Sequence, residues 1–158
     1  YVAGASRVRI IAPDIRCLTF AGIAVRSALG EVSDVSVLGG KVATVDGANA
    51  FDFSWEGTTF RRVSVEGTKV EHYGTGYVIH ARKDAASSLS GPLSAEVALV
   101  NSGAITNMGT GTGREDVSAR ITGPVPSDMS YTGFADGSRW WAADGRLGLR
   151  QSGTWRWL

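Results

Sequence analysis

The stretch that decides the fold is VSVEGTKVEHYGTGYVIHAR, from Val63 to Arg82. It consists of a V-x-V pair, a glycine, an aliphatic residue, a glycine-bearing turn and a second alternating apolar run. Apolar residues at every second position indicate strands with one buried face. Taken alone, the stretch is typical of any β-hairpin. The same outline recurs along the chain, however, and self-similarity at a period of roughly 20 to 50 residues indicates a stacked array.

Four further copies of this outline can be aligned with the first stretch. The best match is VSVLGGKVATVDGANAFDFSW, from Val35 to Trp55, which agrees position by position. A weaker copy covers Val8 to Gly30, and further copies are expected to start at Val97 and at Val117. The small, polar and turn-rich segment from Lys83 to Glu96 is interpreted as an insertion that lengthens one repeat.

A unit of this size cannot bury its apolar side alone, but it can do so when stacked on copies of itself. The stack should place two sets of side chains inside, one above the other: Val35, Val37, Val42, Phe51 and Phe53, with Val63, Val65, Val70, Tyr77 and Ile79. The best helix candidate, Ile23 to Leu29, is too short to support a fold. We therefore predict an all-β solenoid. The alternative is a β-sandwich or jelly roll, in which the repeat would be coincidental.

The last part of the chain, residues 124–158, has a different character from the repeats in 1–123. It holds four of the five tryptophans, Trp140, Trp141, Trp155 and Trp157. Leu147 and Leu149 should share one face of a strand, with Arg146 and Arg150 on the other, and Gln151 to Thr154 predicts a tight hairpin turn. We expect this Trp-rich β-hairpin to cap the open end of the solenoid, or to form a trimer tip, within one structural unit.

Composition excludes several functional classes. The 16 Lys and Arg nearly cancel the 15 Asp and Glu, giving a net charge of +1, and neither sign forms a block. We therefore expect no nucleic-acid partner. Membrane insertion is not expected either, because no apolar run approaches the roughly 18 residues of a membrane span. The single cysteine, Cys17, cannot form an intramolecular disulfide and is interpreted as a small buried apolar residue.

The repeat pattern resembles the rungs of right-handed parallel β-helix proteins of the pectate-lyase-like class, in particular those of bacteriophage tailspikes and tail fibres. The closest likeness lies in Glu31 to Gly40 and Thr58 to Gly67, and the resemblance covers about Val8 to Gly123. It implies a right-handed β-helix, a homotrimer, a virion or extracellular location, other virion proteins as partners and host surface polysaccharide as ligand. Five coils are short for a free-standing spike, which indicates a C-terminal portion of a longer fibre. The resemblance transfers no catalytic residue.

Most catalytic classes find no support in the sequence. A serine triad needs a histidine base, and the only histidines, His72 and His80, are accompanied by no G-x-S-x-G elbow. Neither the histidines nor Cys17 have the spacing of metal ligands, so no metal or other cofactor is expected.

Glycoside hydrolysis is the one reaction for which the sequence offers residues. It needs two carboxylic acids about 5 to 10 Å apart, and stacked strands lie about 4.8 Å apart. Asp46 and Glu71 fall near each other in the repeat alignment and are the candidate catalytic pair; Asp52, Glu56 and Glu66 are further candidates. Because 15 acidic residues scattered over a solenoid must place some near each other, we expect no enzyme. A glycoside hydrolase or polysaccharide lyase is the alternative.

Sugar binding without cleavage needs only exposed aromatic faces flanked by polar groups. Trp140 and Trp141 beside Arg139 are the candidates, and Tyr73 with His72 is another. Neighbouring residues of a strand face opposite ways, so one of the two tryptophans should lie in the core. Packing of the C-terminal tail is the competing role for both.

The resemblance, together with these observations, leads us to expect a structural and receptor-binding protein of a virion fibre or tailspike that binds host surface polysaccharide as a homotrimer. A polysaccharide-degrading β-helix enzyme and a carbohydrate-binding β-sandwich module are the alternatives.

Overall fold

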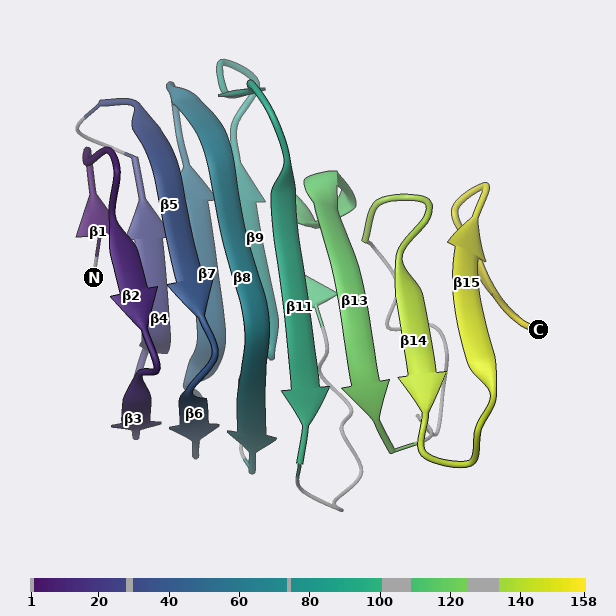
Figure 1. Ribbon diagram of the computed structural model, residues 1–158. Coiled ribbons are helices and arrows are strands. Elements are labelled where there is room, and N and C mark those ends of the chain that lie inside the picture. The colour runs from purple at the N-terminus through teal and green to yellow at the C-terminus, as the bar shows by residue number, and fades with distance from the viewer. Residues whose placement is uncertain (1, 28–29, 74, 101–108, 125–133) are drawn as a thin grey trace.

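The computed structural model of the chain is a parallel β-solenoid of about four turns (Figure 1). It describes residues 2–27, 30–73, 75–100, 109–124 and 134–158. The strands are β1 (Val2–Ala3), β2 (Arg9–Ile11), β3 (Asp14–Cys17), β4 (Ala21–Arg26), β5 (Val32–Leu38), β6 (Lys41–Thr44), β7 (Asn49–Trp55), β8 (Thr59–His72), β9 (Ile79–Lys83), β10 (Ser88–Leu89), β11 (Leu93–Leu99), β12 (Gly109–Thr110), β13 (Val117–Gly123), β14 (Arg139–Ala142), β15 (Leu147–Gln151) and β16 (Thr154–Trp157). One 3₁₀ turn, Arg114–Asp116, precedes β13. No helix of the described residues is long and apolar enough to cross a membrane.

Two sheets face each other across the core. The smaller has the order β1-β4-β7-β9-β12, and the larger has the order β16-β15-β14-β13-β11-β8-β5-β2, with β3, β6 and β10 alongside. Among the described residues, every strand pairing other than β14–β15 and β15–β16 is parallel. The chain therefore passes from one sheet to the other and back as it coils, with one or two consecutive strands in the larger sheet on each turn before β13 (Figure 1). The predicted all-β solenoid is confirmed, and the sandwich alternative is wrong because its strands would be antiparallel.

The register confirms the alignment of the second and third copies. Val35 pairs with Val63, and the next inward position of β5 pairs likewise with β8. Val42 of β6 pairs with Val70. The repeat is about 28 residues long at this point, since Thr44 and His72 in one stack are 28 residues apart.

The fourth copy starts at Leu93, and the predicted start at Val97 is wrong. Leu93 pairs with both Val63 and Val117, whereas Val97 lies opposite Thr68 beyond a β-bulge. The error has a physical reason: in a run of alternating apolar residues, leucine and alanine fill the inward positions as well as valine does. Aligning the copies by their valines alone therefore shifted the predicted start from Leu93 to Val97.

The structure also corrects the predicted insertion and the predicted alignment of the second apolar run. Residues of Lys83 to Glu96 belong largely to strands, because β9 ends at Lys83 and β11 already begins at Leu93. Phe51 pairs with Ile79, not with Tyr77. The aliphatic position expected at Ile105 lies outside the described residues.

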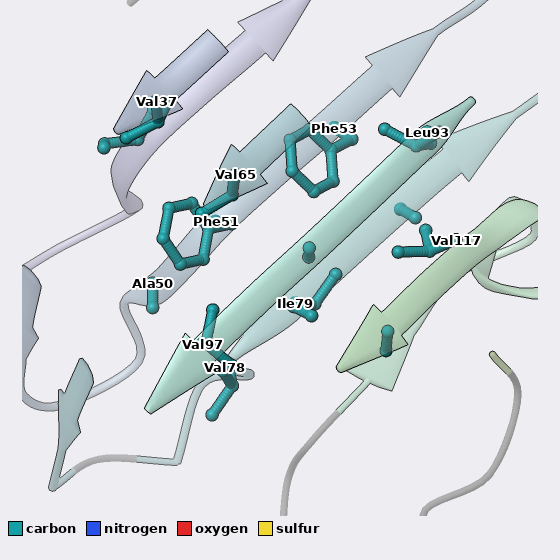
Figure 2. Close-up of a cluster of buried hydrophobic side chains, with 14 of the residues drawn as sticks. Val37, Ala50, Phe51, Phe53, Val65, Val78, Ile79, Leu93, Val97 and Val117 are labelled. Carbon is teal, nitrogen blue, oxygen red and sulfur yellow. The ribbon is translucent and has the colours of Figure 1, made fainter. Parts of the chain in front are cut away.

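The core is formed by aliphatic and aromatic side chains that both sheets direct inward (Figure 2). Phe51 and Phe53 of β7 are fully buried and stack with their ring centroids 6.3 Å apart. Trp55 stacks on Phe60 of the other sheet at 5.0 Å. These rings fill the space between the sheets, where burying an aromatic side chain contributes about 1.5–3 kcal/mol.

The bends of the chain are stacked as regularly as its strands. Arg7, Asp34 and Arg62 adopt positive φ angles of 58°, 54° and 50° on three successive turns. Such angles are uncommon for residues with a side chain. The Arg62 guanidinium hydrogen-bonds to the Asp34 carboxylate, which lowers the pKa of Asp34 below its ordinary value. Charges of alternating sign thus bridge a bend that three turns share.

The C-terminal tail extends the larger sheet. β14 adds to β13 in parallel, and β15 and β16 follow as an antiparallel hairpin. The predicted turn is confirmed: Ser152 and Gly153 connect β15 to β16 with φ angles of 51° and 74°, the signs required by a type I′ turn. The Asp136 carboxylate accepts the N–H groups of both turn residues, at 2.9 and 3.0 Å. That this hairpin caps the core or forms a trimer tip stays a prediction.

The buried face of β15 is the one that carries an arginine, and not the one that carries the leucines. The alternation along β15 is as predicted, yet Arg150 lies on the buried face, only 8% exposed, while Leu147 and Leu149 are half-buried on the other. Among the described residues, none is a hydrogen-bond partner of the Arg150 Nε and Nη1 atoms or of the Trp140 indole nitrogen. The position of a strand in the sheet, and not the polarity of its residues, decides which face is inside here.

Candidate functional site

The outer face of the larger sheet carries an open groove of about 460 Å³ over β8, β11, β13 and β14. Its lining combines one aromatic ring, small side chains and two opposite charges: Gly67, Glu96, Val97, Ala98, Arg120, Thr122 and Trp141. These residues come from four strands that are neighbours only because successive turns stack in register. The groove is therefore a product of the solenoid.

The aromatic residue of the groove is Trp141. Its neighbour Trp140 is buried, at 2% exposed, and pairs with core residue Ile121, whereas Trp141 is 39% exposed. The expectation that one of the two tryptophans lies in the core is thus confirmed. Trp141 pairs with Thr122 on one side and with Leu147 on the other. Trp141 therefore lies beside Thr122 on the sheet and is partly exposed to solvent.

Charged groups accompany the ring along the same face. Arg139 lies two residues before Trp141 on β14, so both side chains point outward, and Arg139 pairs with Arg120 on β13. The Arg120 Nη1 atom lies 3.9 Å from Glu96 Oε2, with both side chains more than half exposed. Contacts of this kind in solvent contribute little to stability, with a median of about 0–1 kcal/mol. These groups are therefore free to exchange one partner for another.

A second hollow of about 380 Å³ continues from the first and shares Glu96 and Arg120 with it. Glu66 and two serines, Ser94 and Ser118, are also part of its lining. The serines belong to a ladder in which Ser36, Ser64, Ser94 and Ser118 pair across four strands. Regularly spaced hydroxyls thus border the acidic and basic groups.

The predicted catalytic pair, Asp46 and Glu71, is not brought together. The register places Glu71 beside Ala43, whereas the backbone carbonyl of Asp46 accepts the N–H of Thr75 at 2.5 Å, several residues further along the chain. Glu71 instead forms an ion pair with Lys41, with 2.9 Å between Oε1 and Nζ. This hydrogen bond raises the pKa of Lys41. Two acids on adjoining strands are found elsewhere, at Glu66 and Glu96, on either side of the bulge in the β8–β11 pairing.

Tyr73 lies away from the tryptophan groove. It is 63% exposed and borders a smaller hollow of about 290 Å³ over β3, β6 and the end of β8, together with Lys41 and Glu71. The structure therefore brings Trp141 and Arg139 of the predicted sugar-binding residues together. It places Trp140 in the core and Tyr73 in a separate hollow.

His72 is not a surface residue, contrary to its interpretation as a sugar-binding partner of Tyr73. It is 5% exposed, because it follows Val70 on the inward face of β8. The Thr44 hydroxyl donates to Nδ1 at 2.6 Å, and Nε2 donates to the Gly76 carbonyl at 2.8 Å. Burial lowers the pKa of His72 from the ordinary value of 6.5, although the bond to Gly76 opposes this effect.

A buried acid on the smaller sheet was named in the sequence only as a secondary candidate. Asp52 is 2% exposed, its Oδ2 lies 3.1 Å from His80 Nδ1, and its Oδ1 lies 3.7 Å from Arg26. Such a carboxylate can orient an imidazole, as in hydrolase triads. Within the described ranges, however, His80 hydrogen-bonds to Asp52 and to no serine or cysteine side chain. The 28-residue spacing of Asp52 and His80 was the signal for this contact.

In the part of the chain that the structure describes, no three His, Cys, Asp or Glu side chains are grouped so that they could hold a metal ion. No family model, curated protein or solved structure matches the chain.

Protonation of His72 should make the stability of the protein depend on pH. Its pKa is lower in the folded than in the unfolded state, so the unfolded state binds more protons between the two values. The free energy of unfolding should therefore fall as the pH decreases below about 6.5, by at most about 1.4 kcal/mol per pH unit. Urea denaturation at pH 7.5 and pH 5.0 measures this loss, which should be smaller in His72→Gln. An equal loss in both proteins would contradict the assignment.

Proposed function

We propose that the protein binds polysaccharide on the outer face of its larger sheet, in the groove that contains Trp141. The observation that carries the proposal is the exposed indole of Trp141, with Thr122 and Arg139 on the same outer face. A sugar ring presents apolar C–H groups on one face and hydroxyls around its edge. A half-exposed indole beside polar groups is complementary to both features.

The shape of the surface supports a polymer over a single sugar. The two hollows are contiguous through Glu96 and Arg120, and together they cross β8, β11, β13 and β14. Strands spaced about 4.8 Å apart repeat similar hydrogen-bonding groups along the solenoid axis. A chain lying across the strands would meet hydroxyl, carboxylate, guanidinium and indole groups in succession.

Loss of the indole should weaken binding. Trp141→Ala should weaken binding to a polysaccharide ligand at least about tenfold, because an aromatic contact and its buried area are removed. Tyr73→Ala is the matched control, since Tyr73 is also an exposed aromatic residue but lies in another hollow. Isothermal titration calorimetry over a panel of soluble polysaccharides measures the affinity, because its signal does not depend on the indole that is removed. Unchanged affinity in Trp141→Ala would contradict the proposal.

The role in a virion fibre is proposed as the setting for this binding. It is supported by the likeness of the rungs to those of tailspikes and by the parallel solenoid fold. This setting implies a homotrimer with its outer faces toward a host surface and with other virion proteins as partners. Light scattering coupled to gel filtration should give a mass of about three chains of 16.6 kDa. A stable monomer would contradict the fibre role without affecting the proposed sugar binding.

Polysaccharide cleavage is a second candidate function, favoured by the position of Glu66 and Glu96. Both acids border the same hollow and lie on adjoining strands, as a pair acting on one glycosidic bond must. Glu66→Gln and Glu96→Gln should each reduce the release of reducing ends at least about a hundredfold. Glu71→Gln, which removes an acid held by Lys41, is the control. Activity that survives both substitutions would exclude this pair.

A further inference from the structure

Three arginines form one row across the strands next to the tryptophan groove. Arg120 of β13 pairs with Arg139 of β14. Leu149 of β15 lies next in the row, and it pairs with Arg156 of β16. All three arginines are exposed, and because register partners share a face, their side chains emerge on the side of the sheet that carries Trp141.

This arrangement is unfavourable for the protein alone. Like charges directly opposite each other on neighbouring strands are destabilising. Four other surface arginines are held by carboxylates: Arg61 by Glu31, Arg62 by Asp34, Arg82 by Glu56 and Arg146 by Asp144. Within the described ranges, neither Arg139 nor Arg156 forms an ion pair, and Arg120 has only the 3.9 Å contact with Glu96. Arg139 and Arg156 therefore present positive charge with no carboxylate partner among the described residues, and Arg120 is only weakly compensated by Glu96.

Arg139 and Trp141 lie close enough to each other to contact the same ligand. Arg139 and Trp141 are two residues apart on β14, so their Cα atoms are separated by about 7 Å. A guanidinium binds a carboxylate through two parallel hydrogen bonds, and an indole stacks on a sugar ring. Building on the proposed polysaccharide binding, we infer that the ligand is an acidic polysaccharide, whose carboxylates pair with Arg139 and Arg120 while a sugar ring lies on Trp141.

Nucleic acid is the other polyanion that an arginine row and an aromatic ring could bind. The acids Glu66 and Glu96 border the same surface, where a DNA phosphate backbone offers them no hydrogen-bond donor, and the net charge of the chain is only +1. A polysaccharide that carries hydroxyl groups as well as carboxylates suits the mixture of serine, threonine and acidic side chains better.

The experiment compares acidic polysaccharides with neutral forms that have the same backbone. Alginate and carboxymethyl cellulose are titrated against the full chain, beside propylene glycol alginate and hydroxyethyl cellulose. A single-stranded oligothymidylate is the nucleic-acid probe. Binding should be confined to the acidic polysaccharides and should weaken as sodium chloride is raised from 50 to 500 mM, because exposed charges are screened.

The variants separate the charge from the ring. Arg139→Gln should weaken binding to the acidic polysaccharides about tenfold, because a charge-assisted bidentate contact is lost. Arg61→Gln removes the same charge from the same sheet away from the groove and should have little effect. Thermal unfolding midpoints close to that of the unsubstituted protein show that both variants are folded.

Every other outcome overturns a definite part of the proposal. Equal binding of neutral and acidic forms, or an Arg139→Gln protein with unchanged affinity, would overturn the acidic ligand while the sugar-binding proposal stands. Tighter binding of the oligothymidylate, lost in Arg139→Gln, would assign the row to nucleic acid. If no polysaccharide binds, both the proposed function and the acidic ligand fail.

Discussion

The structure depends on one constraint, the in-register stacking of parallel strands from successive turns. Each residue lies about 4.8 Å from its equivalent in the next turn, so an inward position that is apolar in one turn is usually apolar in the next. Val35 over Val63 is the simplest case. The same constraint acts on the backbone: when Asp34 takes a left-handed conformation, its neighbours in the stack, Arg7 and Arg62, take it as well. Alternating charge then makes the shared bend favourable.

The candidate site follows from the same stacking on the opposite side of the sheet. Outward positions are free of the demands of the core, so residues of different chemistry can be placed in rows at fixed spacing. Thr122 beside Trp141 and Arg120 beside Arg139 come from turns that are distant in sequence. Their separation is fixed by backbone hydrogen bonds, which hold the surface in shape before a ligand arrives. A rigid surface loses little conformational entropy on binding.

The sequence was sufficient for the fold class and for the register of the two best copies, because the alternation of valines is itself the physical signal for a buried strand face. The prediction failed where the identity of a residue and its position in the strand indicated different things. Leu93 fills an inward position that was sought at Val97. His72 was placed outside because it is polar, although its spacing from Val70 put it inside. The arginine row was not predicted, since it requires β14 to add in parallel to β13, and the repeat pattern does not reach Arg139.

The spacing of stacked residues, which varies only from 30 (Val63 to Leu93) to 19 (Arg120 to Arg139), also bears on how the chain folds. Every contact between turns closes a loop of similar length, so the entropic cost of adding a turn does not grow as the stack lengthens. Pairing the first two turns is the slow event, because no earlier surface exists on which they can assemble. Later turns then add to a ready template, one after another, as in other repeat proteins. Unfolding should correspondingly begin with fraying at the two ends, and the turns around Phe51 should open last.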